Sequence, residues 1–235
     1  MPPKQLADAL TAVNWNKNVE VFLQDSSCVE QIAKANLRLA TWAKQFENID
    51  KGNQALCFIR EMQSAAHHVA ALIGLSLYKS AAGSMRTILE TALYYTYFRT
   101  HLSELATLVR DSDYFLTKEE LLEYHKHHTA EFSTLQQRLG LIGELNAWYS
   151  FISSIIHGQI PGAWIEHKSL SDIKHVKPTL DIAVKSFCDV EKIVYKLFLC
   201  TVGREYWGSF STPAKKLLIS GLHGDIKLAL GLDSA

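Results

Sequence analysis

Proline is scarce in this chain. Its five prolines stand at positions 2, 3, 161, 178 and 213, so the 157 residues between Pro3 and Pro161 contain none. Proline breaks the interior of a helix, and a long stretch without it is typical of long helices. The apolar residues recur with helical spacing along nearly the whole chain. The sequence therefore predicts an all-α fold.

An excess of charge of either sign is also missing. The 24 basic and 24 acidic side chains give a formal net charge of zero. A dedicated duplex-DNA binder is usually basic, because long-range attraction to phosphate depends on positive charge. The balance therefore disfavours that class, although it leaves room for a local basic patch.

Paired cysteines and long apolar runs are absent as well. Cys28, Cys57, Cys188 and Cys200 form no C-x-x-C pair, so a zinc ribbon or a redox motif has no support. The most apolar stretch, residues 65–78, is too short to span a bilayer, and the chain opens on an amphipathic segment rather than a signal peptide. We expect a cytoplasmic protein with buried free thiols and no membrane partner.

Familiar cofactor and metal motifs are missing. The chain has no P-loop, Rossmann glycine fingerprint, zinc-protease motif, G-x-S-x-G elbow or E-x-x-H pair. His125, His128 and Glu131 could share a helix face, but their polar surroundings indicate a solvated face rather than a metal site. His67 and His68 are adjacent and point to different faces. The sequence predicts neither a cofactor nor a bound metal.

Start and stop signals divide the chain into seven or eight helices. Capping boxes at Ser27–Glu30 and Thr117–Glu120 mark two helix starts. The only long irregular segment, residues 158–177, begins directly after His157 and could fold over it. Helices are expected over residues 5–24, 27–49, 53–77, 80–109, 117–140, 144–157 and 178–208, with a last one from Thr212.

The domain organisation follows from the lack of any linker. We expect residues 1–235 to form a single helical bundle. Residues 1–50 are the one part that could form a separate N-terminal hairpin.

A polar stripe runs along the apolar helix that Gly158 ends. Tyr149, Ser153 and His157 are spaced i, i+4 and i+8, so they lie on one face. His157 could simply interact with the last carbonyls of its helix. Alternatively, its imidazole could act in acid–base catalysis, with Ser153 or Tyr149 orienting it or the substrate. The sequence leaves both hypotheses open.

A second polar pair, Arg86 and Glu90, lies in another apolar helix. The two residues are spaced i, i+4 and are flanked by Ala, Leu and Tyr. A buried arginine needs a carboxylate or phosphate partner. The pair could be an internal salt bridge that fixes helix register, or Arg86 could face the same site as His157 and bind an anion.

These two elements resemble the HEPN-type helical proteins, over about residues 55–205. One branch of that superfamily has an R-x-x-x-E helix, here Arg86 to Glu90. It also has an aromatic–x3–Ser–x3–His–Gly helix end, here Tyr149 to Gly158. The resemblance implies a small helical bundle and a role in prokaryotic defence, toxin–antitoxin or RNA processing. It also implies a homodimer with the site at a two-fold interface.

Active HEPN ribonucleases share an R-x4–6-H motif that cleaves RNA without metal. His157 fits this pattern, but positions 150–152 are Ser, Phe and Ile, so the arginine would have to be Arg86 from the other helix. Arg60 and His67 match the R-x6-H spacing but lie early in the chain.

Three hypotheses follow. The chain could be a metal-independent endoribonuclease that uses His157, Arg86, Ser153, Tyr149 and Glu90. It could be a non-catalytic HEPN-like module that binds a nucleotide, RNA or a partner protein. It could also be a structural helical scaffold.

Overall fold

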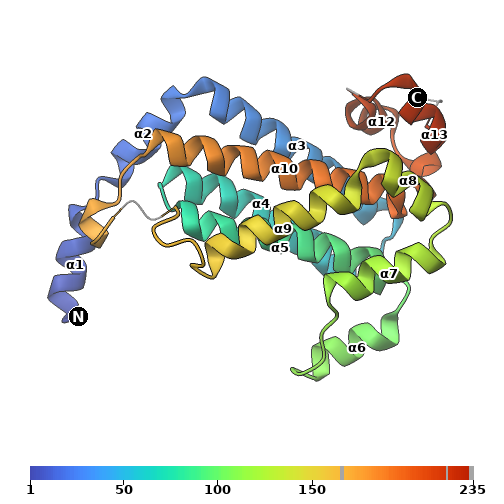
Figure 1. Ribbon diagram of the computed structural model, residues 1–235, viewed down its shortest axis with the longest axis horizontal. Coiled ribbons are helices and arrows are strands. Elements are labelled where there is room, and N and C mark those ends of the chain that lie inside the picture. Colours follow the sequence, from blue (N-terminus) through green and yellow to red (C-terminus); the bar gives the residue numbers. More distant parts are fainter. Residues whose placement is uncertain (165–166, 221, 233–235) are drawn as a thin grey trace.

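The computed structural model describes residues 1–164, 167–220 and 222–232, and every regular element in this part of the chain is helical (Figure 1). The prediction of an all-α fold is therefore confirmed. Figure 1 shows a bundle of long helices with shorter helices gathered at its two ends.

The bundle is organised around α5. α5 packs against α4, α9 and α10, and α10 also packs against α3. The long helices are α3 (Ser26–Ile49), α4 (Leu56–Gly74), α5 (Tyr78–Phe98), α9 (Leu141–Ile156) and α10 (Lys177–Cys200).

Shorter helices surround this bundle. Figure 1 places α1 and α2 at one end and α12 and α13 at the other. α1 buries no residue, so it adds little to the core. The short elements are α1 (Pro3–Ala12), α2 (Trp15–Gln24), α6 (Leu102–Arg110), α7 (Lys118–His128), α8 (Phe132–Leu139), the 3-10 turn Leu170–Asp172, α11 (Val202–Glu205), the 3-10 turn Trp207–Ser209, α12 (Thr212–Ile219) and α13 (Gly224–Leu230).

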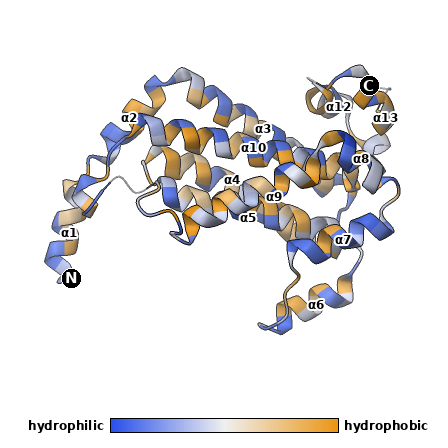
Figure 2. Cartoon of the chain, in the orientation of Figure 1, coloured by the Kyte–Doolittle hydropathy of each residue, from blue (hydrophilic) through white to orange (hydrophobic). Residues whose placement is uncertain are grey.

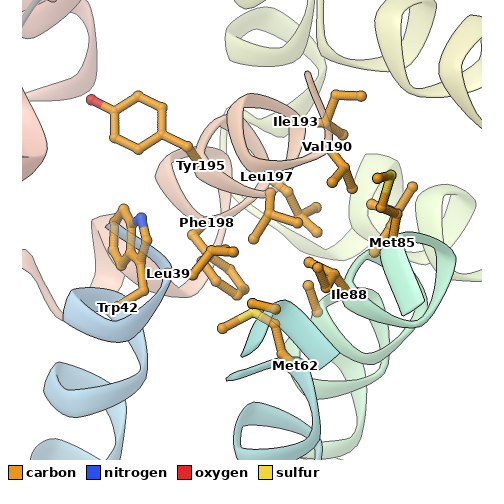
Figure 3. Packing of buried hydrophobic residues seen from close by; sticks show 14 of the residues in the cluster. Leu39, Trp42, Met62, Met85, Ile88, Val190, Ile193, Tyr195, Leu197 and Phe198 are labelled. Atoms are coloured by element: carbon orange, nitrogen blue, oxygen red, sulfur yellow. The ribbon is translucent and has the colours of Figure 1, made fainter. Parts of the chain in front are cut away.

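The core lies where the long helices meet. Figure 2 shows hydrophobic and hydrophilic residues mixed along the long helices, as expected of helices that turn one face to the core. Burying one large apolar side chain stabilises the fold by roughly 1.5–3 kcal/mol. Side chains from four helices fill this region, among them Leu39, Trp42, Met62, Met85, Ile88, Leu197 and Phe198 (Figure 3).

Four of the predicted long helices are interrupted, so the expected count of seven or eight is not confirmed. Asn14 stops the first, because its side chain accepts a hydrogen bond from the backbone N of Lys17 and starts a new helix. Glu131 interrupts the fifth with a left-handed φ of 59°. The helix predicted over residues 5–24 breaks at 13–14, and the one over 80–109 breaks at 99–101. The helix predicted over 117–140 breaks at 129–131, and the one over 178–208 breaks at 201.

One of the two predicted capping boxes is confirmed. The Thr117 side chain accepts from the backbone N of Glu120, and the Glu120 carboxylate accepts from the backbone N of Thr117. The box at Ser27 is wrong, because the N-cap of α3 is Asp25, two residues earlier. Asp25 caps it by accepting from the backbone N of Cys28 at 3.1 Å.

Among the described residues, no single helix is long and apolar enough to cross a bilayer. The pair α8 and α9 meets that length and composition only when the two helices are joined across a 64° bend.

His125 is buried, although the sequence around it is polar. Only 2% of the residue is exposed. Its Nε2 lies 2.8 Å from Oγ1 of Thr96, and its Nδ1 lies 2.8 Å from Oγ1 of Thr129. Burial, with a smaller effect of nearby His101, lowers the pKa of His125 to about 4. The expectation of a solvated face is therefore wrong at this residue, whereas His128 is exposed.

We expect this buried imidazole to make the protein less stable in acid. The unfolded imidazole titrates near its ordinary pKa of about 6.5, well above the folded value of about 4. Between these values the unfolded state binds the extra proton, so acid favours unfolding. This group should lower the free energy of unfolding by about 3 kcal/mol between pH 7 and pH 4. Chemical denaturation at a series of pH values measures the effect.

The variant His125→Gln should lose this part of the pH dependence while being less stable at pH 7.5. His67→Gln is the matched control, because His67 is exposed on α4. An unchanged pH slope in His125→Gln would contradict the assignment.

Candidate functional site

Arg86 and Glu90 on α5 meet Tyr149 and His157 at α9. Nε of Arg86 donates to Oε1 of Glu90 at 2.7 Å, and the Tyr149 hydroxyl donates to the same oxygen at 2.8 Å. Nη1 of Arg86 lies 3.3 Å from Nε2 of His157. The fold thus brings together four of the predicted site residues, which come from two segments far apart in the sequence.

The contact between Arg86 and His157 has a defined direction. A guanidinium has only donors, so Nε2 of His157 accepts and carries no proton in this arrangement. His157 is exposed to solvent, while the side chains of Arg86 and Glu90 are 27% and 38% exposed. The site is therefore open on the histidine side and half-buried on the side of the ion pair.

The segment after α9 does not close over the histidine. The described part of residues 158–177 leaves His157 exposed, and residues 165 and 166 lie outside it. Trp164 is buried and packs edge-on against Phe151 of α9, with ring centroids 6.3 Å apart. The aromatic residue of this segment thus anchors it to α9 and leaves the imidazole open.

The end of α9 fixes the position of His157. Gly158 takes a left-handed φ of 66°, and its backbone N donates to the carbonyl of Ile155 at 3.2 Å. The backbone N of Gln159 donates to the carbonyl of Ser154 at 2.9 Å. These two bonds form a Schellman motif, which requires a residue that tolerates positive φ. The histidine therefore sits at the helix terminus.

Charge and burial shift the ionisation of two of these groups. Partial burial lowers the pKa of Arg86, but its hydrogen bond and charge interaction with Glu90 outweigh burial, and the net pKa shift is upward. Burial and the hydrogen bond to Glu90 raise the pKa of Tyr149 to about 12. Arg86 is thus a fixed cation, and Tyr149 stays a neutral donor at physiological pH.

Ser153 lies between Tyr149 and His157 in the stripe but makes no polar contact with either. Its Oγ is buried and has no hydrogen-bond partner among the described residues. The expectation that Ser153 orients the imidazole therefore finds no contact to support it. Tyr149 also binds Glu90 and not His157.

Lys118 extends the positive side of the site. Two cations lie over the Tyr149 ring, with Cζ of Arg86 4.8 Å and Nζ of Lys118 5.2 Å from the ring centroid. Nζ of Lys118 also donates to Oδ1 of Asn146 at 2.9 Å and pairs with Glu119. No pattern in the sequence indicated this role, because Lys118 has the position of an ordinary first-turn residue of α7.

A cavity of about 360 Å³ opens beside the ion pair, between α5, α7 and α9. Arg86, Glu90 and Tyr149 form one wall of it, and His157 lies outside its lining. Phe115, which is 66% exposed, lines it from the loop before α7. Arg86 therefore links the cavity to the open histidine.

A further cation lies close to the end of α9. Nζ of Lys79 lies 3.7 Å from where a Cβ on Gly158 would be. It forms no ion pair with any carboxylate of the described residues. Positive charge is favourable at a helix C-terminus, and Lys79 remains available to an anion.

The other candidate histidines do not gather into a site. Arg60 of the R-x6-H pair bonds Glu47 at 2.9 Å, and His67 is exposed. Glu131 pairs with Arg204, and α7 ends at His128, so the helical spacing from His125 to Glu131 is broken.

One group of described residues has a spacing that could suit a metal ion. Ligand atoms of Asp25, Cys28 and Asp181 lie within 4.8 Å of one another. Lys177 already neutralises both carboxylates, at 3.0 Å from Asp25 and in direct contact with Asp181. Burial, followed by the hydrogen bond to Asp25, raises the pKa of Cys28 to about 11, which disfavours the thiolate that a metal needs. We interpret the group as an ion-pair network that joins α3 to α10.

No protein-family model, no curated protein and no solved structure matches this chain. The resemblance to HEPN-type proteins therefore depends on the motif residues alone.

We expect Gly158→Ala to destabilise the protein by about 1 kcal/mol, because alanine at positive φ is strained. Gly143→Ala is the matched control on the same helix. Gly143 lies inside α9 and a Cβ there meets no atom within 4 Å, so alanine should stabilise by roughly 0.5–1 kcal/mol. Urea denaturation of both variants measures the two effects. A neutral or stabilising effect of Gly158→Ala would show that the left-handed turn is not needed.

Proposed function

We propose that this chain is a metal-independent endoribonuclease of the HEPN-like type. His157 moves protons and Arg86 holds the scissile phosphate. The proposal is supported above all by the 3.3 Å contact between Nη1 of Arg86 and the unprotonated Nε2 of His157. It places a donor for phosphate oxygens beside a base in an open position.

In the proposed reaction, the nucleophile is the 2′-oxygen of the RNA itself, and protein side chains transfer the protons. The ribose 2′-oxygen attacks the phosphorus and loses its proton to Nε2 of His157. The bond from phosphorus to the 5′-oxygen then breaks, and that oxygen must receive a proton. The products are a 2′,3′-cyclic phosphate and a 5′-hydroxyl. Arg86 would turn Nη1 from His157 to the phosphate, where its charge opposes the charge that develops in the transition state.

Glu90 and Tyr149 are positioning residues in this proposal. Glu90 holds Nε of Arg86, and Tyr149 holds Glu90 and stacks on the guanidinium. The N–H groups of Nη1 and Nη2 of Arg86 would then donate to the phosphate. Lys79 adds a positive charge near His157.

A non-catalytic binding module is the second candidate. The observation that favours it is that, among the described residues, His157 is the one histidine in contact with Arg86, whereas cleavage requires one group to take a proton and another to give one. Without a second group to give the proton, the same residues would bind the phosphate of a nucleotide or RNA, or an acidic partner protein, without turnover. By resemblance, either function would belong to prokaryotic defence or a toxin–antitoxin system.

The test is cleavage of end-labelled RNA in excess EDTA, with the 2′,3′-cyclic ends scored. Wild type should cleave, and His157→Ala should reduce the rate by about 10²–10⁴-fold, because general acid–base catalysis contributes that much. Thermal stability should hardly change, because His157 is exposed. His67→Ala, another exposed histidine, should cleave like wild type.

Equal cleavage by His157→Ala and wild type would overturn the ribonuclease proposal. Absence of cleavage together with a nucleotide-induced rise in melting temperature would support the binding module. A lower melting temperature of His157→Ala with neither activity would favour a structural scaffold.

We also propose that the protein acts as a homodimer. Two copies would supply the second histidine that proton transfer to the leaving oxygen requires, at a two-fold interface near α9. We expect light scattering at micromolar concentration to give twice the monomer mass of 26.4 kDa. A monomer that cleaves RNA at a rate per chain independent of concentration would exclude this arrangement.

A further inference from the structure

The cavity between α5, α7 and α9 adjoins the phosphate site but differs from it in chemistry. Its volume of about 360 Å³ lies within the range of small-molecule pockets, roughly 300–1,000 Å³. Arg86 belongs to both places, since its Nε faces Glu90 in the cavity wall and its Nη1 faces His157 outside. A ligand that enters the cavity would therefore reach Arg86 from the side opposite the histidine.

The charges that line the cavity cancel. Arg86 pairs with Glu90, and Lys118 pairs with Glu119, so two cations face two carboxylates. A phosphate inside the cavity would meet both carboxylates, and an apolar group would leave both ion pairs desolvated. A flat, neutral and polar group fits this lining better than either.

The hydrogen-bonding groups of the lining are mostly acceptors. Each lining hydroxyl already donates its hydrogen within the protein, so towards a ligand it can only accept. Oε1 of Glu90 already accepts from Arg86 and Tyr149, and Oε1 of Glu119 contacts Lys118, so the Oε2 atoms are the carboxylate oxygens left for a ligand. The hydroxyl donations are Thr87 to the carbonyl of Gly83, Thr91 to that of Thr87, Tyr94 to that of Leu116, Thr117 to Glu120, and Tyr149 to Glu90. The cavity therefore favours a ligand that presents several N–H donors.

Aromatic rings provide the stacking surfaces. Tyr94 is held from the core side by Phe58 and Phe98, with ring centroids 5.3 and 5.4 Å away. Phe115 is different, because it is 66% exposed and is not part of the hydrophobic core. An exposed phenylalanine at the edge of a cavity is a suitable platform for a nucleobase.

We propose that this cavity binds the base of the nucleotide whose phosphate is held by Arg86 and His157, with a preference for guanine. Guanine offers a ring N–H and an amino group on one edge, which a carboxylate can accept together. Uracil offers a single N–H there. This inference rests on the proposed function, since it assigns the nucleotide specificity of the same site.

Calorimetric titration with guanosine 3′-monophosphate, uridine 3′-monophosphate and inorganic phosphate tests the proposal. The guanine nucleotide should bind wild type at least tenfold more tightly than either of the other two. In Phe115→Ala its affinity should fall about tenfold or more, because stacking on one aromatic side chain contributes about that much per base. Val109→Ala is the control, since Val109 is 82% exposed on the neighbouring α6 and does not line the cavity.

The possible results distinguish the failure of the base site from the failure of the ribonuclease proposal. Equal affinities for the three probes, with RNA cleavage intact, would overturn the base site and leave the ribonuclease proposal standing. No binding of any probe, and no cleavage, would overturn both. A guanine preference that survives Phe115→Ala unchanged would also overturn the assignment of the base to this cavity.

Discussion

One carboxylate oxygen joins the two helices on which the site depends. Oε1 of Glu90 accepts from Nε of Arg86 within α5 and from the hydroxyl of Tyr149 on α9. A half-buried arginine without a partner would be unfavourable, and the shared oxygen compensates its charge while it locks the ring of Tyr149 against the guanidinium. With Nε held in this way, Nη1 of Arg86 lies 3.3 Å from Nε2 of His157.

Core packing holds α5 and α9 in the positions that bring Glu90, Arg86 and Tyr149 together. α5 is packed against α4, α9 and α10, so its position is fixed by the core on several sides. α9 is fixed by its own core residues and by the left-handed turn at Gly158, which sets where His157 leaves the helix. The site is thus half rigid and half open, since three of its groups lie on helix faces against the core and the histidine projects into solvent. The proposed phosphoryl transfer would use both properties, a positioned cation and an accessible base.

The sequence predicted the all-α class, because proline scarcity and helical spacing are local properties. It also placed Arg86 with Glu90 on one helix and Tyr149 with Ser153 on another, as the structure has them. It did not predict the breaks at Asn14 and Glu131, where a side-chain cap and a left-handed backbone override helical periodicity. The burial of His125, the stacking of Lys118 on Tyr149 and the cavity beside them depend on packing between segments far apart in the chain. Such contacts have no signature in the spacing of one segment.

The surroundings of His125 fix which of its ring nitrogens donates and which accepts. Oγ1 of Thr96 donates to the carbonyl of Leu93 at 2.7 Å, so it can only accept from Nε2 of His125. Nδ1 then accepts from the hydroxyl of Thr129. Thr129, His125 and Thr96 thus donate in one direction along a series of hydrogen bonds. The series runs from the turn between α7 and α8, through the imidazole, to the carbonyl of Leu93 in α5. Adding a proton to the ring places it on Nδ1 and reverses the first of these bonds, so that Nδ1 donates to the hydroxyl of Thr129. The ionisation of this core histidine is therefore coupled to the turn that carries Glu131.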